Sequence, residues 1–195
     1  MRIRFPTSRP VIFGVMFMVA LIMFLPLRMV VSGVTAREAS GLAWAGSLKE
    51  ARVGPAVLGD LDARLSPVRL LVGEARLAVS RADFTGAVVM APNRRAAESV
   101  TGTLPLDGLP VGSFDFSDVS VRFRDGLCDR AEGIVRANTD RGSLSGAARC
   151  DRGALLLPLA NGSGEDKLDL RVTGDGRYDA GIVAGGQPVT ISGQF

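Results

Sequence analysis

The chain has 195 residues, of which 47% are hydrophobic, so it is long enough for one domain with a packed core and too apolar for a disordered polymer. The net charge of +3 is concentrated in residues 1–32, which hold no acidic residue. Without the four arginines of that segment, 19 basic residues remain against 20 acidic ones, and this balance excludes a binder of nucleic acid. Histidine, the commonest general base and metal ligand, is absent, which disfavours an enzyme.

The first segment is apolar and uncharged from Val11 to Leu27. Seventeen residues at about 1.5 Å each give a helix of roughly 26 Å, close to the thickness of a bilayer core. We therefore predict a single transmembrane signal-anchor helix over residues 10–32. The basic residues that flank it are Arg2, Arg4, Arg9 and Arg28.

The positions of these arginines predict the orientation of the anchor. No lysine or arginine occurs between Arg28 and Arg37, so the positive-inside rule places residues 1–9, a basic segment, in the cytoplasm. Residues 33–195 are then exported, and the chain is a single-pass membrane protein. A cleavable signal peptide is the alternative, since Val34–Ala36 reads "VTA", but the apolar run exceeds the usual 7–15 residues and the cut would lie well past its end. A helix buried inside a soluble domain is the least favoured of the three interpretations, because basic residues flank the apolar segment.

After residue 40, apolar and polar residues alternate with the period of a β-strand. The segment Asp118–Gly126 is the clearest, because Val121 and Phe123 fall on one face and Arg122 and Arg124 on the other. The fold class is therefore mainly β, with one antiparallel, curved sheet that has one face in water. The alternating segments are DLDARL at 60–65, EARLAVS at 74–80, DVSVRFRDG at 118–126 and KLDLRVTGDGRY at 167–178.

Turns and connections complete this prediction. Asp125-Gly126 and the segment Gly174–Gly176 have the composition of hairpin turns. The run Arg94–Ser99 has the composition of a helical turn, and Thr101–Ser113, rich in proline and glycine, is predicted to separate two halves of one sheet. We expect one continuous domain over residues 33–195.

Three patterns that resemble catalytic or metal-binding motifs have simpler interpretations. Asp60 and Asp62 share a strand face and could hold a cation, but the alternation around them favours a solvated face. The segment Gly174–Gly181 has Asp179 where a dinucleotide fingerprint needs its third glycine. In Gly142–Gly146 a serine occupies the position where a nucleophile elbow needs glycine. We therefore predict no catalytic residue, no metal site and no cofactor.

The two cysteines, Cys128 and Cys150, lie 22 positions apart. Without histidine or a C-x-x-C spacing, a zinc site or a redox centre is disfavoured. In an oxidising exported compartment, two cysteines predict one disulfide.

Several segments follow one another in a characteristic order: after the apolar N-terminal helix come "GLAWAGSL", "LGDLDARLSPVRLLVGEARLAV", the cysteine pair and "GALLLPLANGSGEDKLDLRVTGDGRY". This order resembles the type II secretion system protein N family (general secretion pathway protein N). One departure is Ala63, where a second tryptophan is expected in the family. The motif residues are Gly41, Trp44, Gly46, Leu65, Ser66 and Pro67. The lone tryptophan, Trp44, is either an interfacial anchor or a core residue, and the second is favoured.

This resemblance implies a non-enzymatic accessory of type II secretion. A membrane-anchored periplasmic β domain would contact other secretion components, those of the inner-membrane platform or the secretin, with no small-molecule substrate. The alternative is a periplasmic lipid-handling or envelope-biogenesis module, which an open groove lined by Leu, Val and Phe would favour and a closed core would disfavour. A periplasmic hydrolase would need a nucleophile and a base, and the sequence pairs no such residues.

Overall fold

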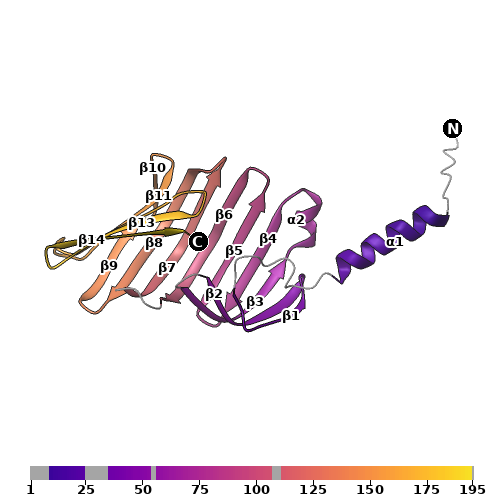
Figure 1. The fold of residues 1–195 in the computed structure, drawn as a ribbon, viewed down its shortest axis with the longest axis horizontal. Helices are drawn as coiled ribbons and strands as arrows, with labels where there is room; N and C mark the ends of the chain where they lie inside the picture. Colours follow the sequence, from indigo (N-terminus) through magenta and orange to yellow (C-terminus); the bar gives the residue numbers. More distant parts are fainter. Residues whose placement is uncertain (1–8, 25–34, 54–55, 107–110, 195) are drawn as a thin grey trace.

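The computed structural model describes residues 9–24, 35–53, 56–106 and 111–194. One antiparallel sheet of 14 strands, not closed into a barrel, makes up the body, which confirms the predicted mainly β class (Figure 1). Strand order across the sheet follows the chain, with one short strand, β10, pairing with β11 off the main path. The strands are β1 Glu38–Leu42, β2 Ala45–Val53, β3 Ala56–Leu65, β4 Ala75–Arg81, β5 Phe84–Ala91, β6 Arg94–Pro105, β7 Val111–Arg124, β8 Leu127–Thr139, β9 Gly142–Ala147, β10 Arg149–Asp151, β11 Ala154–Ala160, β12 Lys167–Val172, β13 Arg177–Ala184 and β14 Gln187–Gln194.

Two helices accompany the sheet. The first, α1, runs over Arg9–Met23, and the second, α2, is the short helix Pro67–Leu71 between β3 and β4. Apolar side chains of α1, such as Phe13 and Phe17, are exposed. Within the described residues, no helix combines the length and the apolar character needed to span a membrane. The predicted anchor over residues 10–32 extends into residues 25–34, which lie outside the described residues, as do Arg2, Arg4 and Arg28.

The alternating segments form strands as the sequence predicts. In β3 the residues Leu61, Ala63 and Leu65 are buried, while those between them are exposed. The predicted turn at Asp125-Gly126 joins β7 to β8. The turn of Gly174–Gly176 joins β12 to β13. The period-two alternation thus correctly placed these strands and both hairpins.

Two local predictions were wrong. Arg94–Ser99 belongs to β6 and is not a helical turn. Thr101–Ser113 does not separate two half-sheets, because Leu104 pairs with Phe114 and the segment connects the neighbouring strands β6 and β7. Residues 107–110 of that segment lie outside the described residues.

A row of β-bulges crosses the middle of the sheet. Ser99, Asp118 and Gly133, on β6, β7 and β8, all have positive φ angles, and the strand registers shift beside them. A Cβ atom at Gly133 would lie 2.5 Å from the Cα of Val119, so only glycine fits there. Each bulge increases the local twist and reverses which side chains point to a given face.

The larger hydrophobic core lies where β11–β13 fold back over β7–β9 (Figure 1). Val135 and Leu159, from β8 and β11, are almost completely buried at its centre. The predicted disulfide is present at the border of this core, with Cys128 of β8 bonded to Cys150 of β10 and a Cα–Cα distance of 5.5 Å. The buried members of the C-terminal core are Val111, Val119, Val121, Val135, Ala137, Leu144, Ala148, Leu155, Leu157, Leu159 and Leu168.

A smaller core lies at the other end of the sheet. Its buried members are Leu48, Ala51, Leu61 and Ala63 of β2 and β3. The strands around this N-terminal core curl until the start of β3 meets the end of β6, where Ala56 forms an isolated bridge with Leu106.

The side chain of Arg81 fastens this curl. It is 19% exposed, and its Nη1 and Nη2 atoms donate to the carbonyl oxygens of Leu58 in β3 (2.6 Å) and Thr103 in β6 (2.9 Å). The guanidinium also pairs with the carboxylate of Asp83, whose pKa is lowered, chiefly by the hydrogen bond from Arg81. The N-terminal core is therefore closed by a polar clasp, since β3 and β6 are not adjacent strands.

Candidate functional site

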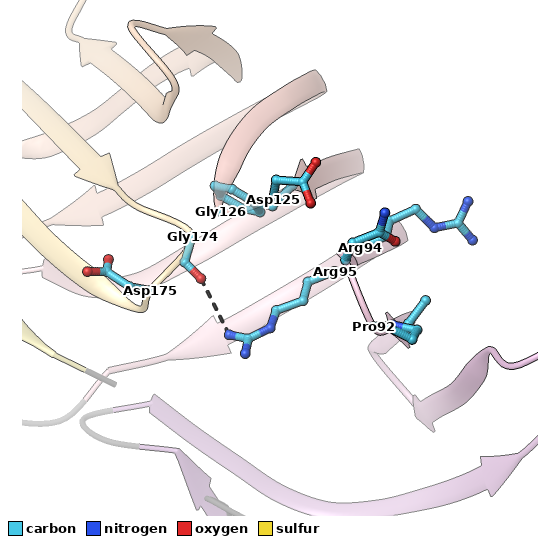
Figure 2. Close-up of a pocket in the computed structure, with 10 residues that line it drawn as sticks. Pro92, Arg94, Arg95, Asp125, Gly126, Gly174 and Asp175 are labelled. Carbon is cyan, nitrogen blue, oxygen red and sulfur yellow. Dashed lines mark hydrogen bonds between the residues drawn. The ribbon is translucent and has the colours of Figure 1, made fainter.

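Three hairpin turns surround a hollow of about 490 Å³ at one end of the sheet (Figure 2). The turns are β5–β6, β7–β8 and β12–β13, so the hollow lies where the C-terminal strands meet the central sheet. Its lining is Ala91, Pro92, Asn93, Arg94, Arg95, Phe123, Asp125, Gly126, Gly174 and Asp175. We call it the three-turn hollow.

Arg95 crosses this hollow. Figure 2 shows its side chain extending from β6 toward the β12–β13 turn, where Nη1 donates a hydrogen bond of 3.4 Å to the carbonyl oxygen of Gly174. The residue is exposed and the bond is long, so much of the guanidinium remains accessible to solvent. The neighbouring Arg94 is instead ion-paired with Glu74, which also binds Arg69 at 3.1 Å. Arg95 is therefore the arginine of the hollow that a ligand can reach.

The walls of the hollow are held by backbone contacts. A Cβ atom at Gly174 would lie 2.4 Å from the carbonyl oxygen of Gly126, so these two turns touch directly. The amide of Asp125 donates to the carbonyl oxygen of Asn93 at 2.9 Å, which joins the other pair of turns. The shape of the hollow is thus set by the backbone and varies little with side-chain rotamers.

The carboxylate of Asp175 in the hollow remains ionised at neutral pH. Hydrogen bonds from Thr173 and Arg177 lower the pKa of Asp175 from 3.8 to about 2. The hollow consequently presents cationic and anionic groups side by side with the ring of Phe123. Such a surface suits a polypeptide segment or another charged group, and it offers no nucleophile paired with a base.

The motif residues come together at the N-terminal core. Gly41, Trp44 and Gly46 lie in the β1–β2 hairpin, and Leu65 and Ser66 lie between the end of β3 and α2, which begins at Pro67. One backbone hydrogen bond joins the two groups, from the amide of Leu65 to the carbonyl oxygen of Ala43 at 2.9 Å. The tip of the hairpin is therefore docked on the end of β3.

Packing explains the residue types of this motif. Gly41 has φ +87°, and a Cβ atom there would lie 2.7 Å from the carbonyl oxygen of Ala45. Leu65 is buried and Trp44 is half-buried, so the tryptophan contributes partly to the packing of the hairpin tip. Ala63, where the family is expected to have a tryptophan, is fully buried opposite Gly46. The motif thus has a structural role in this chain.

Of the aspartate pair considered as a cation site, Asp60 has a structural role. Asp60 accepts a hydrogen bond of 2.9 Å from the amide of Glu50, which has a positive φ angle at a bulge of β2. Within the described part of the chain, no group of three or more His, Cys, Asp or Glu residues could hold a metal ion.

Sequence reasoning missed Arg81 and Arg95, whose hydrogen bonds join strands or turns that are not neighbours in the sheet. Arg95 and Gly174 are 79 positions apart, and local patterns carry no information about such contacts. A weak signal existed, because Arg81 alternates in β4 with Leu77 and Val79, which pack against the N-terminal core, so that a charged residue follows two apolar ones on the same face.

The described residues form a single curled antiparallel sheet with packed cores, a disulfide and a polar hollow, which defines a protein of the mainly β class. The family model for protein N of the type II secretion system (T2SS) matches residues 32–192, and the chain belongs to this family. Membership supports an accessory role in type II secretion and implies interaction with other components of that system. No significant match to the chain was found among curated proteins or among solved structures.

Proposed function

We propose that this chain is an inner-membrane-anchored accessory of type II secretion that presents its β domain in the periplasm to other components of the system. The match to the protein N family over residues 32–192 is the observation that carries this proposal. The apolar, exposed side chains of α1 and the arginines before it support the anchor and its orientation. The disulfide supports an oxidising compartment for the body.

The three-turn hollow is the contact surface that we assign to a secretion partner. It combines an accessible guanidinium, the ionised carboxylate of Asp175 and an aromatic ring on a backbone frame, and all three favour recognition of a polypeptide. Of the residues that line it, Phe123 also packs against the C-terminal core, which fixes the hollow to that core.

A deletion strain tests the proposal directly. Without the chain, secretion substrates should stay folded in the periplasm, at least in part, while export across the inner membrane continues. Restoration by the intact gene is the control. A deletion strain with an unchanged set of secreted proteins but altered outer-membrane lipid or permeability would reject the secretion role and support the lipid-handling alternative.

The structure weighs against that alternative in the C-terminal core. Side chains at the centre of this core pack into one cluster, with Leu159 1% and Val135 0% exposed, which leaves no room for an acyl chain beside them. The hollow lined by Val111, Leu144 and Leu168 at the edge of the core measures about 220 Å³.

Matched charge changes test the hollow. Arg95→Glu should reduce secretion while the protein accumulates normally, because Arg95 is exposed and makes one long hydrogen bond. Arg64→Glu, a similar change on the exposed face of β3, is the control and should leave secretion intact. If the two variants reduced secretion equally, the three-turn hollow would not be the contact surface.

Reporter fusions test the anchor. Alkaline phosphatase fused after residue 40 should be active and β-galactosidase at the same point inactive. Replacement of the N-terminal helix by an unrelated single-span helix of the same orientation should preserve secretion. A mature protein that begins at Arg37 would show instead that the leader is cleaved.

A further inference from the structure

The two end strands of the sheet differ in how well their outer edges are protected. β1 has five residues, and ion pairs of Glu38 with Lys49 and of Arg37 with Glu50 surround it. β14 has eight residues, QPVTISGQ, and none is charged. Soluble proteins protect edge strands with charges, prolines or short lengths, and of these β14 has only Pro188. Among the described residues, no strand pairs with its outer edge.

The hydrogen-bond pattern shows which backbone groups of β14 are free. The amide of Thr173 donates to the carbonyl oxygen of Arg177 at 2.9 Å, so Thr173 and Arg177 form the first hydrogen-bonded pair of the ladder between β12 and β13. In an antiparallel ladder bonded pairs alternate, and the register then directs Tyr178, Ala180 and Ile182 of β13 toward β14.

Their partners in β14 are Gly193, Ile191 and Val189, which use their backbone groups on β13. Pro188, Thr190 and Ser192 therefore direct their backbone groups outward. The proline fits this assignment, because a residue without an N–H is tolerated where the nitrogen faces away from the ladder.

The two faces of β14 carry different kinds of side chain. Val189 and Ile191 share a face with Ile182 and Ala180, which pack against the C-terminal core, yet Val189 is 53% exposed. Thr190 lies on the opposite face with small polar neighbours. An added strand would cover the apolar face of β14 and continue the inner layer of the sheet.

We propose that the outer edge of β14 pairs with the same edge of a second copy of this chain, antiparallel across a two-fold axis at Thr190. In this register each Thr190 exchanges backbone hydrogen bonds with its counterpart, and each Ser192 donates to the Pro188 carbonyl oxygen opposite. Val189 faces Ile191 on the apolar side at both ends of the pair, and β-branched pairs of this kind stabilise sheets.

The chemistry of β14 favours a second copy as the occupant. The strand is complementary to itself, because it carries no charge that the two-fold axis would place opposite a like charge. Moving the axis to Ile191 would pair Ile191 with its counterpart but place Val189 opposite Gly193, so one apolar pair would replace two and Thr190 is the favoured centre.

Sedimentation of the purified full-length chain in detergent tests the proposal. The wild type should show a concentration-dependent dimer. Thr190→Pro should raise the dissociation constant about tenfold or more, since it removes an outward N–H while leaving the ladder to β13 intact. Thr190→Ser is the matched control and should dimerise like the wild type. A monomeric wild type, or a dimer unaffected by Thr190→Pro, would overturn the proposal, and the second result would point to α1 as the interface.

A charge exchange adds a positive test. Thr190→Lys and Thr190→Glu should each be monomeric, because the axis places like charges together, whereas their mixture should form the heterodimer. In cells, Thr190→Cys should give a self-cross-linked dimer with a short thiol-reactive linker, and Ser143→Cys, on exposed β9, should not. Cross-linking of Thr190→Cys only to a different protein would overturn the assignment of a second copy in favour of a partner's strand.

Discussion

The two ends of the sheet bury their apolar faces in different ways. The C-terminal core lies between two layers of strands, contains mostly leucine and valine, and is bordered by a disulfide. The N-terminal core contains two alanines among its four buried members and is closed by the hydrogen bonds of Arg81. Since apolar area removed from water is the main source of stability, the C-terminal core should hold most of the free energy of unfolding.

The largest expected effect comes from a charge in the C-terminal core. Val121→Asp should abolish accumulation of the protein, because Val121 is 8% exposed and a carboxylate there has no partner. Immunoblots of whole cells measure this. Arg122→Asp, one position along on the opposite face, should accumulate normally; loss of both variants would mean that the strand tolerates no change.

Cavity-forming substitutions should separate the two cores. Leu159→Ala should lower the free energy of unfolding by about 3–5 kcal/mol and Leu61→Ala by about 2–3 kcal/mol, because the second site has small neighbours that can close around the gap. Thermal denaturation of the full chain in detergent provides the comparison. Equal losses would show that the two cores unfold as one cooperative unit with equal packing.

Removal of the disulfide should weaken the C-terminal core alone. In the chain-entropy model a loop of this length stabilises by about 3 kcal/mol, so the Cys128→Ser/Cys150→Ser double variant should melt at a clearly lower temperature. Hydrogen exchange should rise in β8 and β10 and stay unchanged in β2 and β3. The native cysteines should resist alkylation until they are reduced; free thiols in protein taken from the periplasm would contradict this.

Loss of the Arg81 clasp should have the converse effect. Arg81→Met keeps the aliphatic stem and removes the hydrogen bonds to Leu58 and Thr103, which should cost about 1.5–3 kcal/mol. Hydrogen exchange should increase in β3 and at the end of β6. Arg76→Met, which breaks a pair with Glu98 that is partly exposed, is the control and should cost less.

The smallest effect concerns pH at the three-turn hollow. The folded-state pKa of Asp175, about 2, lies below its ordinary value of 3.8, so its stabilising contribution is complete above that ordinary value and is lost as pH falls through 2. The carboxyl resonance of Asp175 in an NMR titration should show this midpoint. Thr173→Val should raise the midpoint, because the hydrogen bond from Thr173 is the largest cause of the shift; an unchanged midpoint would assign the shift to Arg177.

Local features of this fold could be predicted from the sequence, and long-range ones could not. The alternation in β3 and the turns at Asp125-Gly126 and Gly174–Gly176 follow from period two and turn chemistry alone. The full length of β7 did not, because the bulge at Asp118 shifts the alternation: Phe116 and Val119 both pack against the C-terminal core although their spacing is odd. A period-two pattern is interrupted at such a residue, and the strand then resembles two shorter ones.

The functional surface was predictable only in part. The disulfide followed from the inferred compartment and the number of cysteines. The hollow around Arg95 did not, because it exists only when the β12–β13 turn meets β6, a contact between residues 79 positions apart. The family motif was recognised, but its structural role, the docking of a hairpin tip on the end of β3, needed the hydrogen bond of Leu65 to Ala43.

The strand order has a consequence for how the molecule forms. From β1 to β9 each strand pairs with the strand before it, so most partners are separated only by a hairpin turn and the loops to be closed are short. Such local contacts favour fast folding. A polypeptide that leaves a channel with its N-terminus first exposes its strands in the order in which they pair in the sheet. The partly folded domain therefore adds strands at one edge only. The bond of Cys128 to Cys150 can form once residue 150 has arrived and the contact of Arg95 with Gly174 once residue 174 has arrived, so both fasten a sheet whose first nine strands are already present.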